Sequence, residues 1–153
     1  MHLNFCQLSN VLGVFPVILA FQHGLYLLGT IMFLGMSLSI YYHADESNEI
    51  AFFMDVAGCA MLSSYMFYIV MNAEILLTYV NLLTVSYTGM ALVFYVAAGE
   101  PGDEDYPLYH TAWHVFAMYA ASTFVYSYIN TTLEKDSPSR MSTKAVIPWI
   151  TAT

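Results

Sequence analysis

The stretch ILLTYVNLLTVSYTGMALVFYVAA, residues 75–98, contains no charged side chain over 24 positions. An uninterrupted apolar run of about 18 or more residues is typical of a helix that spans a membrane. At about 1.5 Å per residue, this run is long enough to cross a hydrocarbon core of about 30 Å. The stretch therefore predicts a membrane protein.

The composition of the whole chain agrees with this prediction. Of its 153 residues, 59% are hydrophobic and 9% are charged, whereas soluble domains carry about 25% charged residues. This composition excludes a water-soluble enzyme and a disordered regulator. Three Lys and Arg against eleven Asp and Glu also exclude a nucleic-acid binder, because the chain would repel phosphates. The two cysteines, Cys6 and Cys59, are too few for a disulfide framework and are predicted to be small buried side chains.

Similar runs recur along the chain and predict five transmembrane helices, at about residues 3–21, 24–43, 50–71, 75–98 and 106–129. The segments between them are short, which makes consecutive helices antiparallel neighbours. We therefore expect an all-α polytopic membrane protein with a compact bundle of five transmembrane helices within residues 1–130. A C-terminal tail, residues 131–153, is expected to lie at the membrane interface, because it is polar at first and then carries an apolar stretch with a Trp.

The few charged residues predict an orientation for this bundle. All three basic residues, Lys135, Arg140 and Lys144, lie in the tail. The positive-inside rule therefore predicts that the tail is on the cytoplasmic, or matrix-equivalent, side and that the N-terminus is on the outer or luminal side. Two loops that hold seven acidic residues would share the outer side: Asp45, Glu46, Glu49, Glu100, Asp103, Glu104 and Asp105.

A small set of polar side chains lies inside the predicted spans, where ionisable groups are costly and indicate function. From the helical rise, Asp55 lies about 9 Å inside its span, and His110 and His114 lie about 7 and 13 Å inside theirs. His43 lies roughly 3 Å inside, with Ser39 one turn deeper. All of these residues enter the membrane from the same side.

Their spacing predicts a joint metal site. His110 and His114 are four residues apart and share one face of a helix, so they can bind one metal ion. Together with His43 from a second helix, they would leave a fourth zinc position open, as in catalytic zinc sites. Zinc lowers the pKa of a bound water to about 7 and so supplies a nucleophile near neutral pH. Asp55 could orient a histidine or interact with that water, and Ser39 could donate to a substrate carbonyl.

Each of these residues also has a simpler explanation by itself. An isolated pair of histidines four residues apart on an apolar helix is more often structural, and His43 alone would extend toward the membrane interface. The matched depth of the set on three helices favours the metal site, because ionisable groups in lipid need partners.

The polar residues form a series along the chain: Ser39-x-x-x-His43, then Asp55 in the following span, then His110-x-x-x-His114 in the last span. This series resembles the CREST superfamily of membrane hydrolases. This superfamily includes alkaline ceramidases, progestin and adiponectin receptors, and a myomaker-like branch, to which this sequence is most similar. The resemblance implies three zinc ligands, His43, His110 and His114. It further implies that Asp55 is a general base or supports a ligand, that Ser39 is a supporting polar group, and that a lipid amide bond is hydrolysed. Family members have seven spans, whereas five are predicted here, so about two helices of the usual bundle are absent.

Two functions follow as expectations. The first is a zinc-dependent hydrolase that acts on lipid amide or ester bonds. The second is a non-catalytic accessory subunit of a larger membrane complex, for example an energy-converting assembly. A reduced bundle with apolar faces and an apolar stretch at residues 145–150 could occupy a position among other subunits. Membrane lipids are the expected partners in both cases, and a receptor or transporter has less support because no basic residue lies at midplane.

Overall fold

Helices make up all the regular secondary structure in residues 5–72 and 79–135, which are the residues described by the computed structural model of the chain. The elements in order are α1 (Phe5–Asn10), the 3₁₀ turn η1 (Val11–Gly13), α2 (Val14–Gln22), α3 (Tyr26–Tyr42), α4 (Glu49–Asn72), α5 (Tyr79–Ala98) and α6 (Tyr106–Lys135). Because α1, η1 and α2 follow one another without a break, they form one long helix. The described part of the chain is therefore all-α with five helices, as predicted.

Three of these helices are long and apolar enough to cross a membrane: Phe5–Gln22, Glu49–Met71 and Asn81–Ala98. The predicted span at 24–43 corresponds to α3, an apolar helix of 17 residues, which is about 25 Å long. The predicted span at 106–129 corresponds to α6, which continues to Lys135 and contains many Tyr, Ser and Thr residues. Three candidate spans indicate a membrane protein, and the insertion of all five helices stays a prediction. The predicted interfacial tail lies mostly outside the described residues.

The 3₁₀ turn in the first helix has a local cause. Proline has no backbone N–H, so Pro16 cannot donate to the carbonyl of Leu12 four residues earlier. The helix tightens into a 3₁₀ turn at Val11–Gly13, which contains Leu12, the residue whose carbonyl loses this hydrogen bond. Short 3₁₀ segments are a common way to accommodate such a defect.

A glycine allows the chain to reverse between α2 and α3. Gly24 has a φ of 74°, a left-handed conformation that other residues adopt at a cost. Its N–H donates to the carbonyl of Phe21 (3.1 Å), and the N–H of Leu25 donates to the carbonyl of Ala20 (2.9 Å). These two bonds form a Schellman motif, which satisfies carbonyls at the end of α2.

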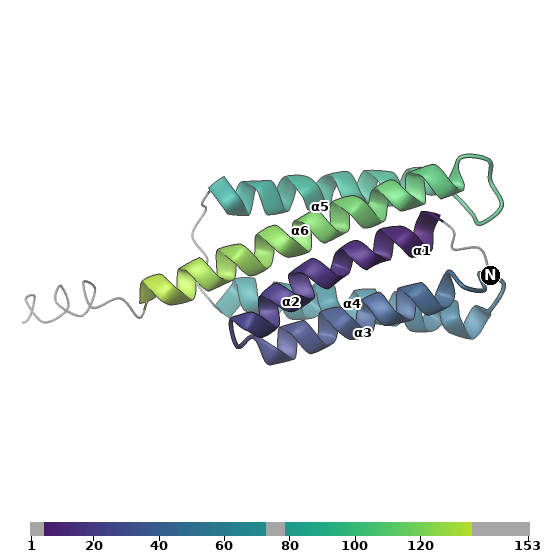
Figure 1. Cartoon of the computed structure of the whole chain (residues 1–153). Helices are drawn as coiled ribbons and strands as arrows, with labels where there is room; N and C mark the ends of the chain where they lie inside the picture. The colour runs from purple at the N-terminus through teal and green to yellow at the C-terminus, as the bar shows by residue number, and fades with distance from the viewer. Residues whose placement is uncertain (1–4, 73–78, 136–153) are drawn as a thin grey trace, which may run out of the picture.

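The helices pack in adjacent pairs (Figure 1). The first helix lies across α3 and α6, whereas α4 packs mainly against α3 and α5 packs along α6. The loops after α3 and α5 lie at the same end of the bundle as the start of α1. Consecutive helices therefore run antiparallel, as the short loops predicted.

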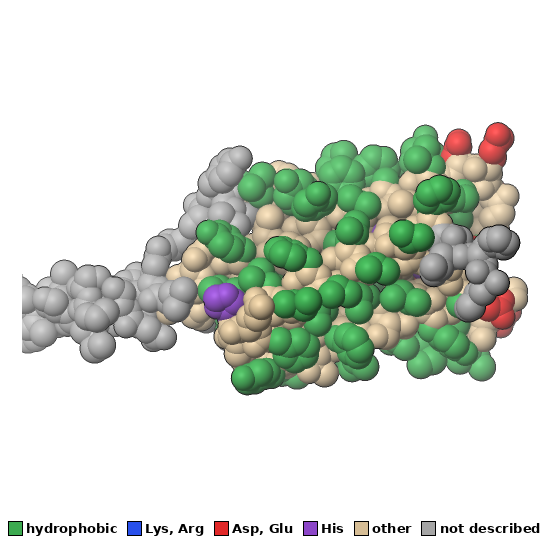
Figure 2. Space-filling model, viewed as in Figure 1, with side chains coloured by type: hydrophobic (Ala, Val, Ile, Leu, Met, Phe, Trp, Pro, Cys, Tyr) green, Lys and Arg blue, Asp and Glu red, His purple; other side chains and the backbone are tan. Residues whose placement is uncertain are grey.

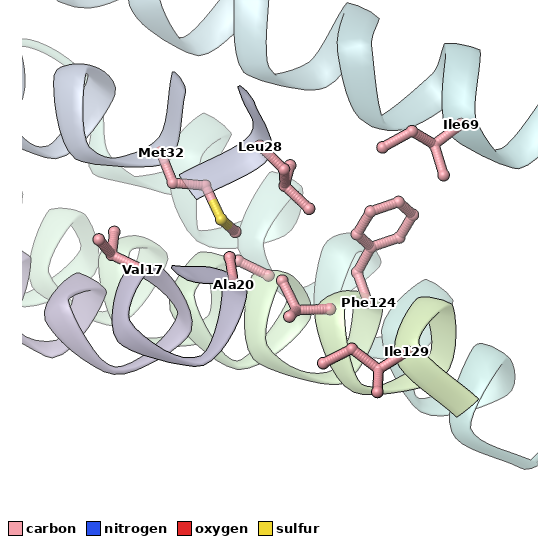
Figure 3. Close-up of a cluster of buried hydrophobic side chains, with 9 residues drawn as sticks. Val17, Ala20, Leu28, Met32, Ile69, Phe124 and Ile129 are labelled. Atoms are coloured by element: carbon pink, nitrogen blue, oxygen red, sulfur yellow. The ribbon is translucent and has the colours of Figure 1, made fainter. Parts of the chain in front are cut away.

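A cluster of buried apolar side chains lies toward the other end, near the α2–α3 turn (Figure 3). It joins α2, α3, α4 and α6 through nine buried residues: Val17, Ala20, Leu28, Met32, Ile69, Ala121, Phe124, Val125 and Ile129. This cluster fixes the helices at one end and leaves the opposite end to the polar residues.

Large apolar side chains also cover the outside of the bundle (Figure 2). Val96 is 79% exposed, and Phe53 and Leu108 are each 67% exposed. An apolar surface this extensive is unfavourable in water but suits contact with lipid or with other membrane helices. The surface therefore agrees with the membrane character of the sequence.

Close contact between α3 and α4 depends on Gly35 and Gly58. A Cβ atom at Gly58 would lie 3.2 Å from Cδ1 of Leu38 and 3.4 Å from Cα of Gly35. Small residues at such crossings allow membrane helices to approach closely.

We expect Gly58→Val to destabilise the bundle by about 1–3 kcal/mol, because its branched side chain would force α3 and α4 apart. Unfolding in detergent, followed by circular dichroism, measures this loss. Gly89→Val is the matched control, since a Cβ at Gly89 meets nothing within 4 Å. Equal stability of the two variants would contradict the role given to Gly58.

Candidate metal centre

Three buried histidines meet at the end of the bundle where α3 ends and α6 begins. His43 is the C-cap of α3, and His110 and His114 lie on the first turns of α6. Their exposed fractions are 2%, 6% and 2%. The three ring centroids lie 4.7 to 5.0 Å from one another. The structure thus brings together all three histidines that the sequence singled out.

The ring nitrogens are close enough to share one metal ion. One nitrogen from each of His43, His110 and His114 lies within 4.8 Å of the others, and Nε2 of His43 is 3.1 Å from Nε2 of His110. Zn–N distances of about 2.0–2.1 Å in a tetrahedral site place two ligand nitrogens about 3.3 Å apart. This cluster could therefore hold a metal ion with little movement.

Oxygen atoms hold the outer nitrogens of two of these rings. Nδ1 of His43 donates to Oε1 of Glu46 at 2.7 Å. Nδ1 of His114 lies 2.9 Å from Oγ of Ser9 and 3.2 Å from the carbonyl oxygen of Cys6. Metal-binding histidines usually make such a contact with the nitrogen that does not face the metal.

Two buried polar atoms at the site have no hydrogen-bond partner: Nε2 of His114 and Oδ1 of Asp55. Buried polar groups without partners are uncommon in native proteins and cost about 1–3 kcal/mol each. A metal ion would satisfy Nε2 of His114, and a water or substrate group at the fourth position could satisfy Asp55. The donor set therefore fits zinc, which prefers imidazole nitrogen and can keep one position open.

Asp55 and Ser39 extend the site toward the interior of the bundle. Asp55 lies on α4 and Ser39 on α3, and each is 5% exposed. The Ser39 side chain lies beside the Asp55 carboxyl, which is also close enough to His43 for direct electrostatic interaction. Both of these predicted residues thus lie near the histidine cluster.

Aromatic rings cover the cluster. Tyr106 and Trp113 pack on His110 with centroid distances of 4.7 and 4.9 Å, and Tyr42 packs on His43 at 4.9 Å. Such rings exclude water and lower the local dielectric constant, which strengthens electrostatic interactions within the site.

Ser9 and Glu46 contact the histidines but were not predicted as residues of the site. Glu46 could have been found, because it lies three residues after His43, whereas Ser9 is 105 positions away from His114 and has no sequence signal. Cys6 also lies here: it is buried, as predicted, and with His43 and Glu46 forms a second group whose ligand atoms lie within 4.8 Å of one another. Cys59 is partly buried.

Acidic side chains gather at the same end of the molecule (Figure 2). All seven acidic residues expected in loops are exposed or partly exposed. Glu49 is the first residue of α4, and the other six lie in the loops after α3 and α5: Asp45, Glu46, Glu100, Asp103, Glu104 and Asp105. A surface with one sign of charge raises the local concentration of cations. The end of the bundle that holds the histidines therefore favours the approach of a metal ion.

Comparison with protein family models, curated proteins and solved structures found no significant match to this chain.

We expect the purified protein to bind zinc in a one-to-one ratio and His110→Ala to lose most of it, because two imidazoles hold the ion less tightly than three. Elemental analysis after gel filtration measures the metal content. Cys6→Ala is the control, since Cys6 belongs to the alternative group of donors and its backbone carbonyl remains. Loss of zinc in Cys6→Ala with full binding in His110→Ala would contradict the three-histidine site.

Proposed function

We propose that this chain is an integral membrane protein with a zinc site at His43, His110 and His114, and that it hydrolyses an amide or ester bond of a lipid. The observation that carries this proposal is a cavity inside the bundle that reaches His114, one of the three histidines. Both Ser39 and His114 line the cavity, so a bound substrate would reach the site from inside the bundle.

The cavity has the size and character of a small-molecule site. Its volume is about 330 Å³, at the lower end of the range of about 300–1,000 Å³ for ligand pockets. Its wall extends from Ser39 to Met32 on α3 and from His114 to Ala121 on α6, in each case about 10 Å along the helix. Apolar side chains such as Leu62 and Met66 form much of the wall away from the histidines. A hydrocarbon chain would suit this lining.

Residues of the chain can take distinct parts in the reaction. Zinc, when bound, would supply a Lewis acid and a nucleophilic water. The unpartnered Oδ1 of Asp55 can accept a proton and later return it to the leaving group. The Ser39 hydroxyl can donate to the oxygen of the bond under attack, where negative charge develops. Burial of the site supports this chemistry, because charges interact more strongly away from water.

The resemblance to the CREST superfamily leads to the same proposal, since its polar series is the one that meets in this bundle. We take the chain to be a shortened relative of the myomaker-like branch. The absence of about two helices is consistent with the packing, in which α4 contacts mainly α3 and α5 contacts mainly α6. Residues of both α4 and α5 line the cavity, so its wall lies partly between these two helices.

A second function, that of an accessory subunit, is supported by the outer surfaces of α4 and α5. Only 17% of the candidate span in α4 and 11% of that in α5 is buried inside the bundle. These faces could contact lipid or the helices of a larger membrane complex. The apolar stretch at residues 145–150, expected to contact such a partner, lies outside the described residues.

We further propose the orientation expected from the sequence. The acidic end with the histidines would face the outer or luminal side, and the end that carries Lys135 would face the cytoplasm.

Zinc-loaded protein in detergent should release fatty acid from a ceramide-like amide. We expect Asp55→Asn to lower the rate by about 10²–10⁴-fold while zinc remains bound, because the variant loses a proton acceptor but no ligand. Mass spectrometry of the released fatty acid and metal analysis measure both properties.

Ser37→Ala is the matched control, since Ser37 is partly exposed and its hydroxyl donates to the carbonyl of Phe33 in its own helix. Its rate should equal that of the wild type. Equal rates in wild type and Asp55→Asn would contradict the role of Asp55 as the proton acceptor. No release of fatty acid by the zinc-loaded wild type would contradict the hydrolase and favour the accessory subunit.

A further inference from the structure

The first helix contributes a side chain to the histidine cluster, although none of its residues belongs to the three-histidine set. Ser9 on α1 lies 2.9 Å, from Oγ to Nδ1, from His114 on α6. Both residues are buried, with exposed fractions of 5% and 2%. This contact joins two helices that are far apart in the sequence, at the ring whose other nitrogen has no partner.

The directions of the hydrogen bonds determine which nitrogen of His114 carries a proton. The carbonyl oxygen of Cys6 can only accept, and it lies 3.2 Å from Nδ1 of His114. The hydroxyl of Ser9 donates to the same carbonyl at 2.8 Å, which leaves its lone pairs free to accept. Both contacts of Nδ1 are therefore satisfied when Nδ1 carries the hydrogen. In the neutral ring, Nε2 then holds a lone pair.

That lone pair is then available to a metal ion. Nε2 of His114 is buried and has no hydrogen-bond partner, and His114 belongs to the group of three histidines whose ligand nitrogens lie within 4.8 Å of one another. If the ring were in the other tautomer, Nδ1 would face the Cys6 carbonyl with a lone pair, and Nε2 could not bind a metal ion.

We propose that Ser9, together with the carbonyl of Cys6, is a positioning residue that holds His114 in the tautomer and ring orientation needed to bind the metal. This inference rests on the proposed metal centre and adds the first helix to it. His43 has a comparable contact with Glu46, but that contact is local. The contact of Ser9 makes metal binding depend on the docking of α1 against α6.

Metal-free protein labelled with ¹⁵N in its histidine rings tests the tautomer directly by NMR, with the His114 signal assigned from a His114→Gln variant. We expect Nδ1 of His114 to be protonated in the wild type and both tautomers to be present in Ser9→Ala. A role of Ser9 in helix stability alone would not change the tautomer. A wild-type His114 protonated at Nε2 would overturn the proposal, even if Ser9→Ala does not fold.

Competition with a chelator then measures the affinity for zinc. We expect Ser9→Ala to bind zinc about 10–100-fold more weakly, Ser9→Thr to retain most of the affinity because its hydroxyl remains, and Ser37→Ala to match the wild type. Wild-type affinity in a folded Ser9→Ala would overturn the role of Ser9 and leave the metal centre intact. A wild-type protein that binds no zinc would overturn the metal centre itself.

Discussion

The packing of three imidazole rings in an apolar bundle is the constraint on which the rest of this structure depends. Burying a polar nitrogen without a partner is costly, and Nε2 of His114 is buried and has no hydrogen-bond partner. Nε2 atoms of His43 and His110 are already at a separation close to that of two ligands of one ion. A bound cation would give Nε2 of His114 the partner that it lacks. The Glu46 carboxylate and the Ser9 hydroxyl contact Nδ1 of His43 and Nδ1 of His114, so that Nε2 is the nitrogen that each of these two rings can offer to an ion.

The two ends of the bundle differ in the side chains that they hold. Apolar packing between α2, α3, α4 and α6 fixes the helices near the α2–α3 turn. The opposite end carries the histidines, the aromatic rings that cover them and most of the acidic side chains. The cavity lies between these ends and extends from Ser39 and His114 toward Met32. A stable apolar end allows the other end to hold polar groups that by themselves would destabilise a bundle in lipid.

The length of the apolar runs predicted the helices. The spacing of the histidines and the order of the helices predicted that His43, His110 and His114 lie at one end of the bundle. The four-residue spacing of His110 and His114 fixes their common face, and the antiparallel order of helices brings His43 to the same end. The contacts that orient the rings could not be predicted in this way. Ser9 meets His114 because α1 docks against α6, and such tertiary packing leaves no periodic signal. The predicted span begins at residue 24, whereas α3 begins at Tyr26, because Gly24 is left-handed and belongs to the turn after α2.

X-ray absorption spectroscopy of the zinc-loaded protein tests the central claim most directly, because it reports the ligands of the ion rather than its presence. The structure predicts scattering from three imidazole rings at Zn–N distances of about 2.0–2.1 Å, with a further light atom completing a four-coordinate site. Sulfur at about 2.3 Å would place the ion at Cys6, His43 and Glu46 instead. That result, or a signal from fewer than three imidazoles, would contradict the three-histidine centre.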